Sequence, residues 1–312
     1  MTVGQPCPHC AELTGTTDQF CESCGADLRV RRDRTDRVEI DLGALAGVSD
    51  RGRVHVRNED AMALGHGTAL GQRTPGRSAT RLAAVVCDGV STVHSPELAS
   101  RAAAESALDV LLSAGSVPDL PAEHRTRDAV AAAARAVAAL SAPGTRDAPS
   151  CTLVSALVDR SDPDLPEITV AWVGDSRAYW LAGAGAAEPA RLLTADHSWA
   201  AEMVAAGMLD VATAMADVRA HAITHWLGAD GEPEPGVVTL RPAGPGVLLL
   251  CSDGLWNYLP NAEGLAAVAV PAVERRTGAL DAAAALTAVA LEGGGRDNIT
   301  AVVIPITARS PS

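Results

Sequence analysis

Apolar and polar positions alternate along the chain in a way that divides the part beyond about residue 38 into short β-like runs and longer Ala-rich helical runs. The β-like runs are rich in Val and Leu and are bounded by Gly, Pro or Asp, as buried strands are. The predicted strands are 82–87, 151–158, 168–173, 178–181, 247–251 and 299–304. The predicted helices are 96–112, 123–140, 198–206, 262–270 and 279–292.

The order of these elements indicates the fold class. Several predicted strands follow one another with no helix between them, notably the two that meet at residues 174–177. This order favours antiparallel sheets with helices packed outside, an α+β layered fold, over a doubly wound parallel sheet. The segment at about 197–231 is helical and interrupts the strands, as an inserted flap does.

Length and composition support a folded protein with an appendage. The chain has 312 residues, of which 47% are hydrophobic and 20% charged, which is too apolar for intrinsic disorder. Aromatic residues make up only 3%, so the core must consist mainly of Ala, Val and Leu. The length predicts about two domains, or one large domain with a smaller attachment.

The charge balance excludes one class of partner. The 25 basic residues, all Arg, stand against 38 acidic residues, and the net charge of −13 disfavours general binding of nucleic acid. No apolar run approaches the roughly 20 residues that span a bilayer. The first residues lack the basic and apolar regions of a signal peptide, so we expect a cytoplasmic protein without a membrane span.

Residues 1–28 predict a small zinc-binding domain. They contain Cys7-Pro8-His9-Cys10 and Cys21-Glu22-Ser23-Cys24-Gly25. Each CxxC turn can aim two thiolates at one tetrahedral Zn²⁺, and so short a segment would fold only with the metal. A redox CxxC pair is the alternative, but it needs only one such motif. We therefore expect a zinc ribbon in which Cys7, Cys10, Cys21 and Cys24 bind one Zn²⁺, with His9 not needed as a ligand.

The charge of this ribbon suggests a protein partner. Residues 1–28 contain no Lys or Arg, so contact with a phosphate backbone would gain nothing. We expect the ribbon to dock onto protein. An Arg-rich linker is predicted at 29–44, either as a solvated hinge or as a docking strip for an acidic partner. The remaining cysteines, Cys87, Cys151 and Cys251, lie in β-like runs and are expected to be buried and unpaired.

Acidic residues stand where the predicted apolar strands begin or end. They are Asp60, Asp88, Asp175, Asp253 and Asp297. One such Asp alone would indicate a turn or a helix cap. Several that converge without Lys or Arg would repel one another strongly unless cations lay between them. Oxygen ligands without a His cluster favour Mg²⁺ or Mn²⁺.

The motifs around these residues resemble those of the metal-dependent protein phosphatases of type 2C, which act on phosphoserine and phosphothreonine. The matching segments, in the family's order, are Arg57-Asn58-Glu59-Asp60, Cys87-Asp88-Gly89, Ser150-Cys151-Thr152-Leu153, Val173-Gly174-Asp175-Ser176-Arg177-Ala178-Tyr179, Leu193-Thr194-Ala195-Asp196-His197-Ser198, Cys251-Ser252-Asp253-Gly254-Leu255-Trp256 and Arg296-Asp297-Asn298-Ile299-Thr300. The resemblance implies a phosphatase domain over 45–308 with two stacked antiparallel sheets flanked by helices.

The resemblance also implies the site. Asp60, Asp88 and the Gly89 carbonyl would hold two Mn²⁺ or Mg²⁺ ions, with Asp88 between them. Asp253 and Asp297 would complete the shell of one ion, and Asp175 would bind a third. A water that bridges the two ions would attack the phosphorus of the substrate in line. The implied partner is a phosphoprotein made by a serine/threonine kinase.

Two positions depart from the family pattern. The family usually has a phosphate-binding Arg at the position of His55, and here Arg53 and Arg57 flank that residue. Some members have a proton-donating His at the position of Val90, which leaves a metal-bound water or His94 for that role. A neutral His is the weaker phosphate ligand. The alternative to an active enzyme is therefore a catalytically weak or silent module of the same fold that binds phosphoproteins.

Overall fold

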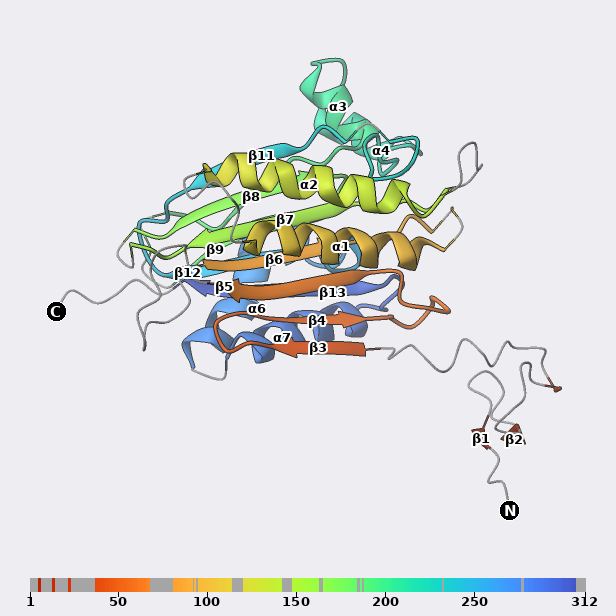
Figure 1. Ribbon diagram of the computed structural model, residues 1–312, viewed down its shortest axis with the longest axis horizontal. Coiled ribbons are helices and arrows are strands. Elements are labelled where there is room, and N and C mark those ends of the chain that lie inside the picture. Colours follow the sequence, from red (N-terminus) through yellow and green to blue (C-terminus); the bar gives the residue numbers. More distant parts are fainter. Residues whose placement is uncertain are drawn as a thin grey trace. The chain divides into compact units, whose positions relative to one another are not determined.

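The chain divides into two units, Met1–Asp36 and Arg37–Ser312, in the computed structural model (Figure 1). The structure describes residues 5–6, 13–14, 22–23, 37–67, 81–91, 93, 95–113, 120–141, 148–162, 165–183, 186, 188–231, 233–275 and 278–306. In the first unit, β1 (Gln5–Pro6) pairs antiparallel with β2 (Leu13–Thr14). The four cysteines of the predicted zinc ribbon lie outside the described residues, so the ribbon remains a prediction.

The second unit contains two antiparallel sheets. The six-stranded sheet has the order β10 (Arg191–Leu192), β9 (Arg177–Ala182), β12 (Gly246–Cys251), β13 (Ile299–Ile306), β4 (Ala46–Asp50) and β3 (Arg37–Asp41). The five-stranded sheet has the order β11 (Gly236–Leu240), β8 (Glu167–Val173), β7 (Leu153–Asp159), β6 (Arg81–Cys87) and β5 (Ala61–Gly67).

Helices cover the outer face of each sheet. Figure 1 shows α1 (Pro96–Leu112) and α2 (Ala122–Ala138) side by side, and both contact the five-stranded sheet. On the six-stranded sheet lie α6 (Ala262–Glu274) and α7 (Ala279–Glu292). A third apolar cluster fills the space between the sheets. The central strands are thus buried on both faces, which explains their near-continuous apolar sequences.

Small side chains allow these layers to approach closely. The buried face of α1 includes Ala99, Ala103 and Ala107, all fully buried against the sheet. At Gly65 in β5, even a methyl group would overlap the side chain of Leu112 at the end of α1. The Ala-rich composition therefore serves tight packing of helices on the sheet.

The predicted fold class is confirmed, since two antiparallel sheets are flanked by helices. Each predicted strand and helix corresponds to an observed one, and the predicted helices 96–112 and 279–292 have the observed bounds. The strands β3, β4, β5, β10 and β11 of the second unit were not predicted. Because β3 begins at Arg37 and pairs with β4, the linker expected at 29–44 includes a strand of the sheet.

The helical insertion at 197–231 packs mainly on itself. It contains α3 (Trp199–Ala205) and α4 (Val211–Ala216), and a bridge between Ser198 and Ile223 closes its base. Ala200, Ala214 and Ala220 form a small buried cluster of their own. Within the described part of the chain, no helix is long and apolar enough to cross a membrane.

Candidate metal centre

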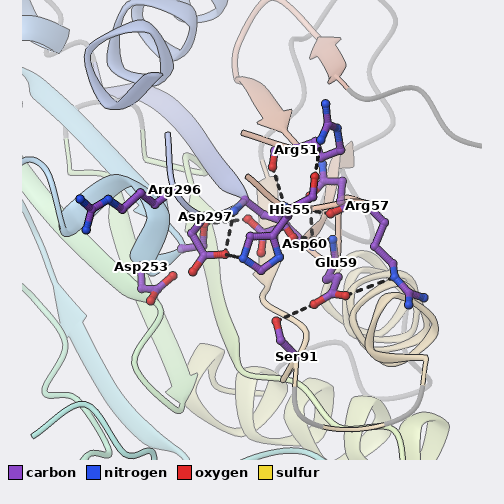
Figure 2. A network of polar contacts seen from close by, with 12 residues as sticks. Arg51, His55, Arg57, Glu59, Asp60, Ser91, Asp253, Arg296 and Asp297 are labelled. Atoms are coloured by element: carbon purple, nitrogen blue, oxygen red, sulfur yellow. Dashed lines mark hydrogen bonds and ion pairs between the residues drawn. The ribbon is translucent and has the colours of Figure 1, made fainter. Parts of the chain in front are cut away.

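Four of the predicted aspartates lie at one edge of the two sheets, where strands of both begin or end. Asp60 directly precedes β5 and Asp88 directly follows β6, and these strands pair antiparallel, which places the two residues near each other. Asp253 and Asp297 stand at the corresponding ends of β12 and β13. Figure 2 shows Asp60, Asp253 and Asp297 in one neighbourhood.

Asp60 is held by hydroxyl groups from the other sheet. Its Oδ2 accepts hydrogen bonds from Ser252 Oγ and Thr300 Oγ1, each at 2.7 Å. Its Oδ1 is buried and has no hydrogen-bond partner in the structure. Burial raises the pKa of Asp60 to about 7, although the two hydroxyl hydrogen bonds lower it. One oxygen of this carboxylate is thus fixed, and the other is left for a ligand.

Asp88 carries a buried carboxyl group whose pKa is strongly perturbed. Burial raises its pKa well above the ordinary value, and the charges of Asp60 and Asp253 raise it further. Its backbone N–H donates to Thr152 Oγ1 at 3.2 Å, and its carbonyl accepts from Thr152 N at 2.8 Å. These bonds fix the backbone just where the side chain enters the cluster.

Gly89 continues this rigid backbone. A Cβ atom at Gly89 would lie 2.8 Å from the Glu59 carbonyl oxygen and 2.8 Å from Pro96 Cβ. Only glycine allows this close approach between the end of β6, the loop before β5 and the start of α1. The position of the Gly89 carbonyl is therefore set by tight packing.

Asp253 and Asp297 lie on the side of the six-stranded sheet. Asp253 begins the short helix α5 (Asp253–Trp256), and its Oδ2 accepts from Asn257 Nδ2 at 3.2 Å. Among the described residues its buried Oδ1 has no hydrogen-bond donor, and burial followed by the charge of Asp297 raises the pKa of Asp253 to about 6. Asp297 Oδ1 accepts from Asn298 N at 2.8 Å and lies 3.2 Å from His55 Nε2.

Asp175 lies near the same cluster, at the turn between β8 and β9. Burial raises its pKa to about 7, with the charges of Asp253 and Asp196 acting in the same direction. The nearby Arg177 does not neutralise it by an ion pair, because its guanidinium donates to both oxygens of Asp196, at 2.9 and 2.7 Å. Arg177 also stacks on Trp256, with its Cζ atom 3.7 Å from the ring centroid.

The three predicted phosphate ligands have different surroundings. His55 faces Asp297 and is the one nearest to the carboxylates (Figure 2). Arg57 instead forms ion pairs with Glu97 at 3.1 Å and with Glu59 at 3.4 Å. The Arg53 side chain is exposed, and its backbone N–H donates to the Gly295 carbonyl at 2.7 Å. His94 lies outside the described residues.

Asn298 is a site residue that the sequence analysis did not single out. Its Oδ1 accepts from Glu59 N at 2.7 Å, and its Nδ2 donates to the carbonyls of Arg51 and Arg57 at 2.8 and 3.0 Å. It is almost completely buried. Asn298 therefore ties the loop that carries His55 to the strand end that carries Asp297. Its signal in the sequence is its place next to Asp297, within the segment 296–300 that resembles the family.

The donor set fits hard divalent cations. Among the described residues, no ion pair with an Arg or His balances Asp60, Asp88 or Asp253, and two buried carboxylate oxygens have no partner. In the same part of the chain, no group of three or more His, Cys, Asp or Glu side chains is arranged to hold one ion by itself. Mg²⁺-type ions, however, usually take one or two carboxylates and keep several waters. Asp60 and Asp88 with the Gly89 carbonyl would meet that requirement for one ion, and Asp88 shared with Asp253 and Asp297 would supply the other.

Comparison with known proteins identifies the family. A family model described as protein phosphatase 2C matches residues 57–290. This match covers well over half of the chain, so the chain belongs to the protein phosphatase 2C family. The serine/threonine phosphatase stp of Listeria innocua is 33% identical over 153 residues, which are 49% of this chain and 55% of that protein. The chain thus spans about half the length of the curated relatives it matches.

Solved structures share the fold of the second unit. The Mycobacterium tuberculosis serine/threonine phosphatase PstP/Ppp is similar with a TM-score of 0.65 and 25% identity, over 84% of this chain and 98% of that one. The catalytic domain of the phosphatase PstP in complex with two manganese ions gives a TM-score of 0.62 and 25% identity. The match covers 87% of this chain and 99% of that domain.

Proposed function

We propose that the chain is a metal-dependent protein phosphatase that hydrolyses phosphoserine and phosphothreonine. The observation that carries the proposal is the gathering of Asp60, Asp88, Asp253 and Asp297 at one edge of two sheets with two buried carboxylate oxygens unpartnered. Membership of the protein phosphatase 2C family and relatives described as serine/threonine phosphatases support it. The substrate would be a phosphoprotein made by a serine/threonine kinase.

The proposed ligand set holds two ions of Mn²⁺ or Mg²⁺. It consists of Asp60, Asp88, the Gly89 carbonyl, Asp253 and Asp297, and Asp175 is assigned to a third ion. The structure of the PstP catalytic domain in complex with two manganese ions supports the proposed number of two ions. When bound, such ions supply positive charge for the phosphoryl oxygens and a water of lowered pKa.

The chain's own residues orient the ligands and the substrate. The hydroxyls of Ser252 and Thr300 hold one Asp60 oxygen, which leaves the other, buried oxygen for an ion. We assign His55 to the phosphoryl group, because its ring lies beside Asp297 while Arg57 is engaged by two carboxylates. Arg53 is exposed at the same loop and is the second candidate.

Hydrolysis of p-nitrophenyl phosphate and of a phosphothreonine peptide tests this function. We expect turnover that requires Mn²⁺ or Mg²⁺ and is lost in Asp88→Ala and in Asp297→Ala. Asp109→Ala, which removes an exposed carboxylate of α1, is the matched control and should keep the wild-type rate. Absence of turnover with either metal, with binding of the phosphopeptide retained, would contradict the enzyme and support a silent phosphoprotein-binding module.

For the first unit we propose a zinc ribbon that docks onto protein. Cys7, Cys10, Cys21 and Cys24 supply four thiolates, which is a complete tetrahedral set for one Zn²⁺. One equivalent of zinc per chain, lost in Cys21→Ser, is the expected metal content. Removal of residues 1–28 should preserve hydrolysis of p-nitrophenyl phosphate and change the rate on a protein substrate. A chain that contains all four cysteines but no zinc would contradict the ribbon.

A further inference from the structure

A groove lies directly beside the aspartate cluster. It encloses about 470 Å³ and is lined by Gly254, Asn257, Tyr258, Gly293, Arg296 and Asp297. Asp297 belongs to both the groove and the cluster. A group that occupies the groove would therefore lie next to whatever is bound at the carboxylates.

The groove has a defined wall. The Tyr258 hydroxyl accepts a hydrogen bond from the backbone N–H of Arg296 at 3.0 Å, which links the end of α5 to the loop after α7. A Cβ atom at Gly293 would lie 2.5 Å from Tyr258 Cδ1, so a side chain there would displace the ring. Tyr258 and the loop of Arg296 thus hold each other in place.

The polar side chains that line this groove are those of Asn257, Tyr258, Arg296 and Asp297, so donor groups stand beside one carboxylate. The Tyr258 hydroxyl uses a lone pair for Arg296 N, which leaves its own proton to donate. The Arg296 side chain is exposed, and among the described residues its guanidinium forms no ion pair or hydrogen bond. Figure 2 shows Arg296 across Asp297 from His55. The groove therefore presents a guanidinium that has no ion-pair partner among the described residues, on the side of Asp297 away from the assigned phosphate ligand.

We propose that this groove binds an anionic side chain of the substrate, at a position flanking the phosphoresidue, with Arg296 as its counter-ion. The inference rests on the proposed phosphatase function and adds a preference for acidic phosphopeptides. A planar guanidinium can bind a carboxylate or a second phosphate through two parallel hydrogen bonds. Because the net charge is −13, the rest of the protein surface tends to repel an acidic peptide. A cation beside the site therefore has a clear effect on which phosphopeptides bind.

Matched phosphothreonine peptides test the preference. Each carries Glu, Gln or Lys at one of the two positions on either side of the phosphothreonine, and a doubly phosphorylated peptide separates phosphate from carboxylate recognition. The quantity measured is kcat/KM with Mn²⁺, divided by the rate of the same variant on p-nitrophenyl phosphate. An exposed ion pair contributes little binding free energy. We therefore expect kcat/KM of the wild type to be about 3- to 5-fold higher for the Glu peptide than for the Gln peptide at one position or more.

The variants assign this preference to Arg296. In Arg296→Gln the Glu-to-Gln ratio should fall to about one, and in Arg296→Glu the Lys peptide should become the better substrate. Arg241→Gln is the matched control, because Arg241 is an exposed arginine at the opposite end of the five-stranded sheet, and it should keep the wild-type ratio.

Two results would overturn the inference. One is a wild type that turns over all peptides without preference, and the other is a preference that persists in Arg296→Gln. Either result leaves the phosphatase function intact. A wild type with no turnover of any phosphomonoester would overturn the proposed function and this inference with it.

Discussion

The Ser252 hydroxyl donates a hydrogen bond of 2.7 Å to Asp60 Oδ2 and thereby joins the end of β12 in one sheet to the start of β5 in the other. Thr300, at the start of β13, donates to the same oxygen at 2.7 Å and also contacts Ser49 Oγ at 2.8 Å. The two sheets are therefore connected at the carboxylate that we assign to the metal. Correct docking of the sheets and correct orientation of Asp60 depend on the same contacts.

These hydroxyls should control metal affinity. We expect Ser252→Ala and Thr300→Val each to weaken Mn²⁺ binding by about 10-fold, since residues that orient metal ligands commonly have effects of that size. Calorimetric titration with Mn²⁺ measures the change. Ser155→Ala is a suitable control, because Ser155 is buried in β7 and donates to the Ala171 carbonyl. Dissociation constants within twofold of the wild type for both variants would contradict the assigned role.

Asp88 should oppose folding when no metal is bound. Burial and the neighbouring carboxylates raise its pKa well above the ordinary value, so the folded state disfavours its charge. We expect Asp88→Asn to raise the unfolding free energy of the metal-free protein at about pH 8, because the amide carries no charge that the folded state disfavours. The same variant should lose the stabilisation by Mn²⁺ and the hydrolysis of p-nitrophenyl phosphate.

Thermal unfolding with EDTA or with Mn²⁺ checks both effects of Asp88→Asn. Asp109→Asn removes an exposed carboxylate of α1 and should leave both curves unchanged. If the metal-free Asp88→Asn protein were less stable than the wild type, the carboxylate would be contributing to the fold, against our interpretation.

The cluster also predicts how stability depends on pH. The pKa values of Asp60 and Asp175 are raised to about 7 and that of Asp253 to about 6, mainly by burial. The folded state therefore binds more protons than the unfolded state between about pH 4 and pH 7. The resulting destabilisation is absent below about pH 4, grows as the pH rises through this interval, and is complete for these three groups about one pH unit above 7, while the raised pKa of Asp88 acts in the same direction.

The melting temperature of the metal-free protein should accordingly fall between pH 5 and pH 8. Saturating Mn²⁺ should reduce that fall, because cations then balance the carboxylates. Differential scanning fluorimetry in EDTA and in Mn²⁺ over this pH range makes the comparison. A metal-free melting temperature that rises over the same interval would show that the carboxylates are not destabilising.

The sequence predicted the central strands and the aspartates at their ends for a physical reason. Strands such as β7, β8 and β12 are buried on both faces, so they read as continuous apolar runs, and an Asp at the end of such a run stands out. Two of the unpredicted strands, β3 and β5, lack this signal. β3 has exposed positions at the edge of its sheet, and β5 contains two glycines and a histidine.

The residues that orient the ligands could not be found in this way. Ser252 and Thr300 are common residue types at strand ends, and their role comes from contacts with Asp60, which is distant in the sequence. Asn298 likewise bonds to a loop more than 200 positions away, with sequence separations of 239, 241 and 247. Such contacts exist only after the two sheets have packed together.

Asn298 should matter for stability as well as for the site. Asn298→Ala removes side-chain hydrogen bonds to three buried or half-buried backbone groups, those of Arg51, Arg57 and Glu59. We expect a loss of about 2–3 kcal/mol in the free energy of unfolding, measured with urea. Asn261→Ala provides the control, since Asn261 is exposed at the start of α6 and makes no side-chain capping bond. A loss below about 0.5 kcal/mol in Asn298→Ala would refute the assigned role.

Replacing His55 tests how the phosphate is held. Its ring lies 3.2 Å from Asp297, whereas Arg57 is engaged by Glu97 and Glu59. Because a guanidinium binds phosphate through two hydrogen bonds and keeps its charge, His55→Arg should lower the inhibition constant for inorganic phosphate by about 10-fold. His55→Ala should raise it, and Arg57→Ala should change it by less than His55→Ala does. Steady-state hydrolysis of p-nitrophenyl phosphate with added phosphate gives these constants. If Arg57→Ala had the larger effect, the phosphate ligand would be Arg57, which would first have to leave its two carboxylates.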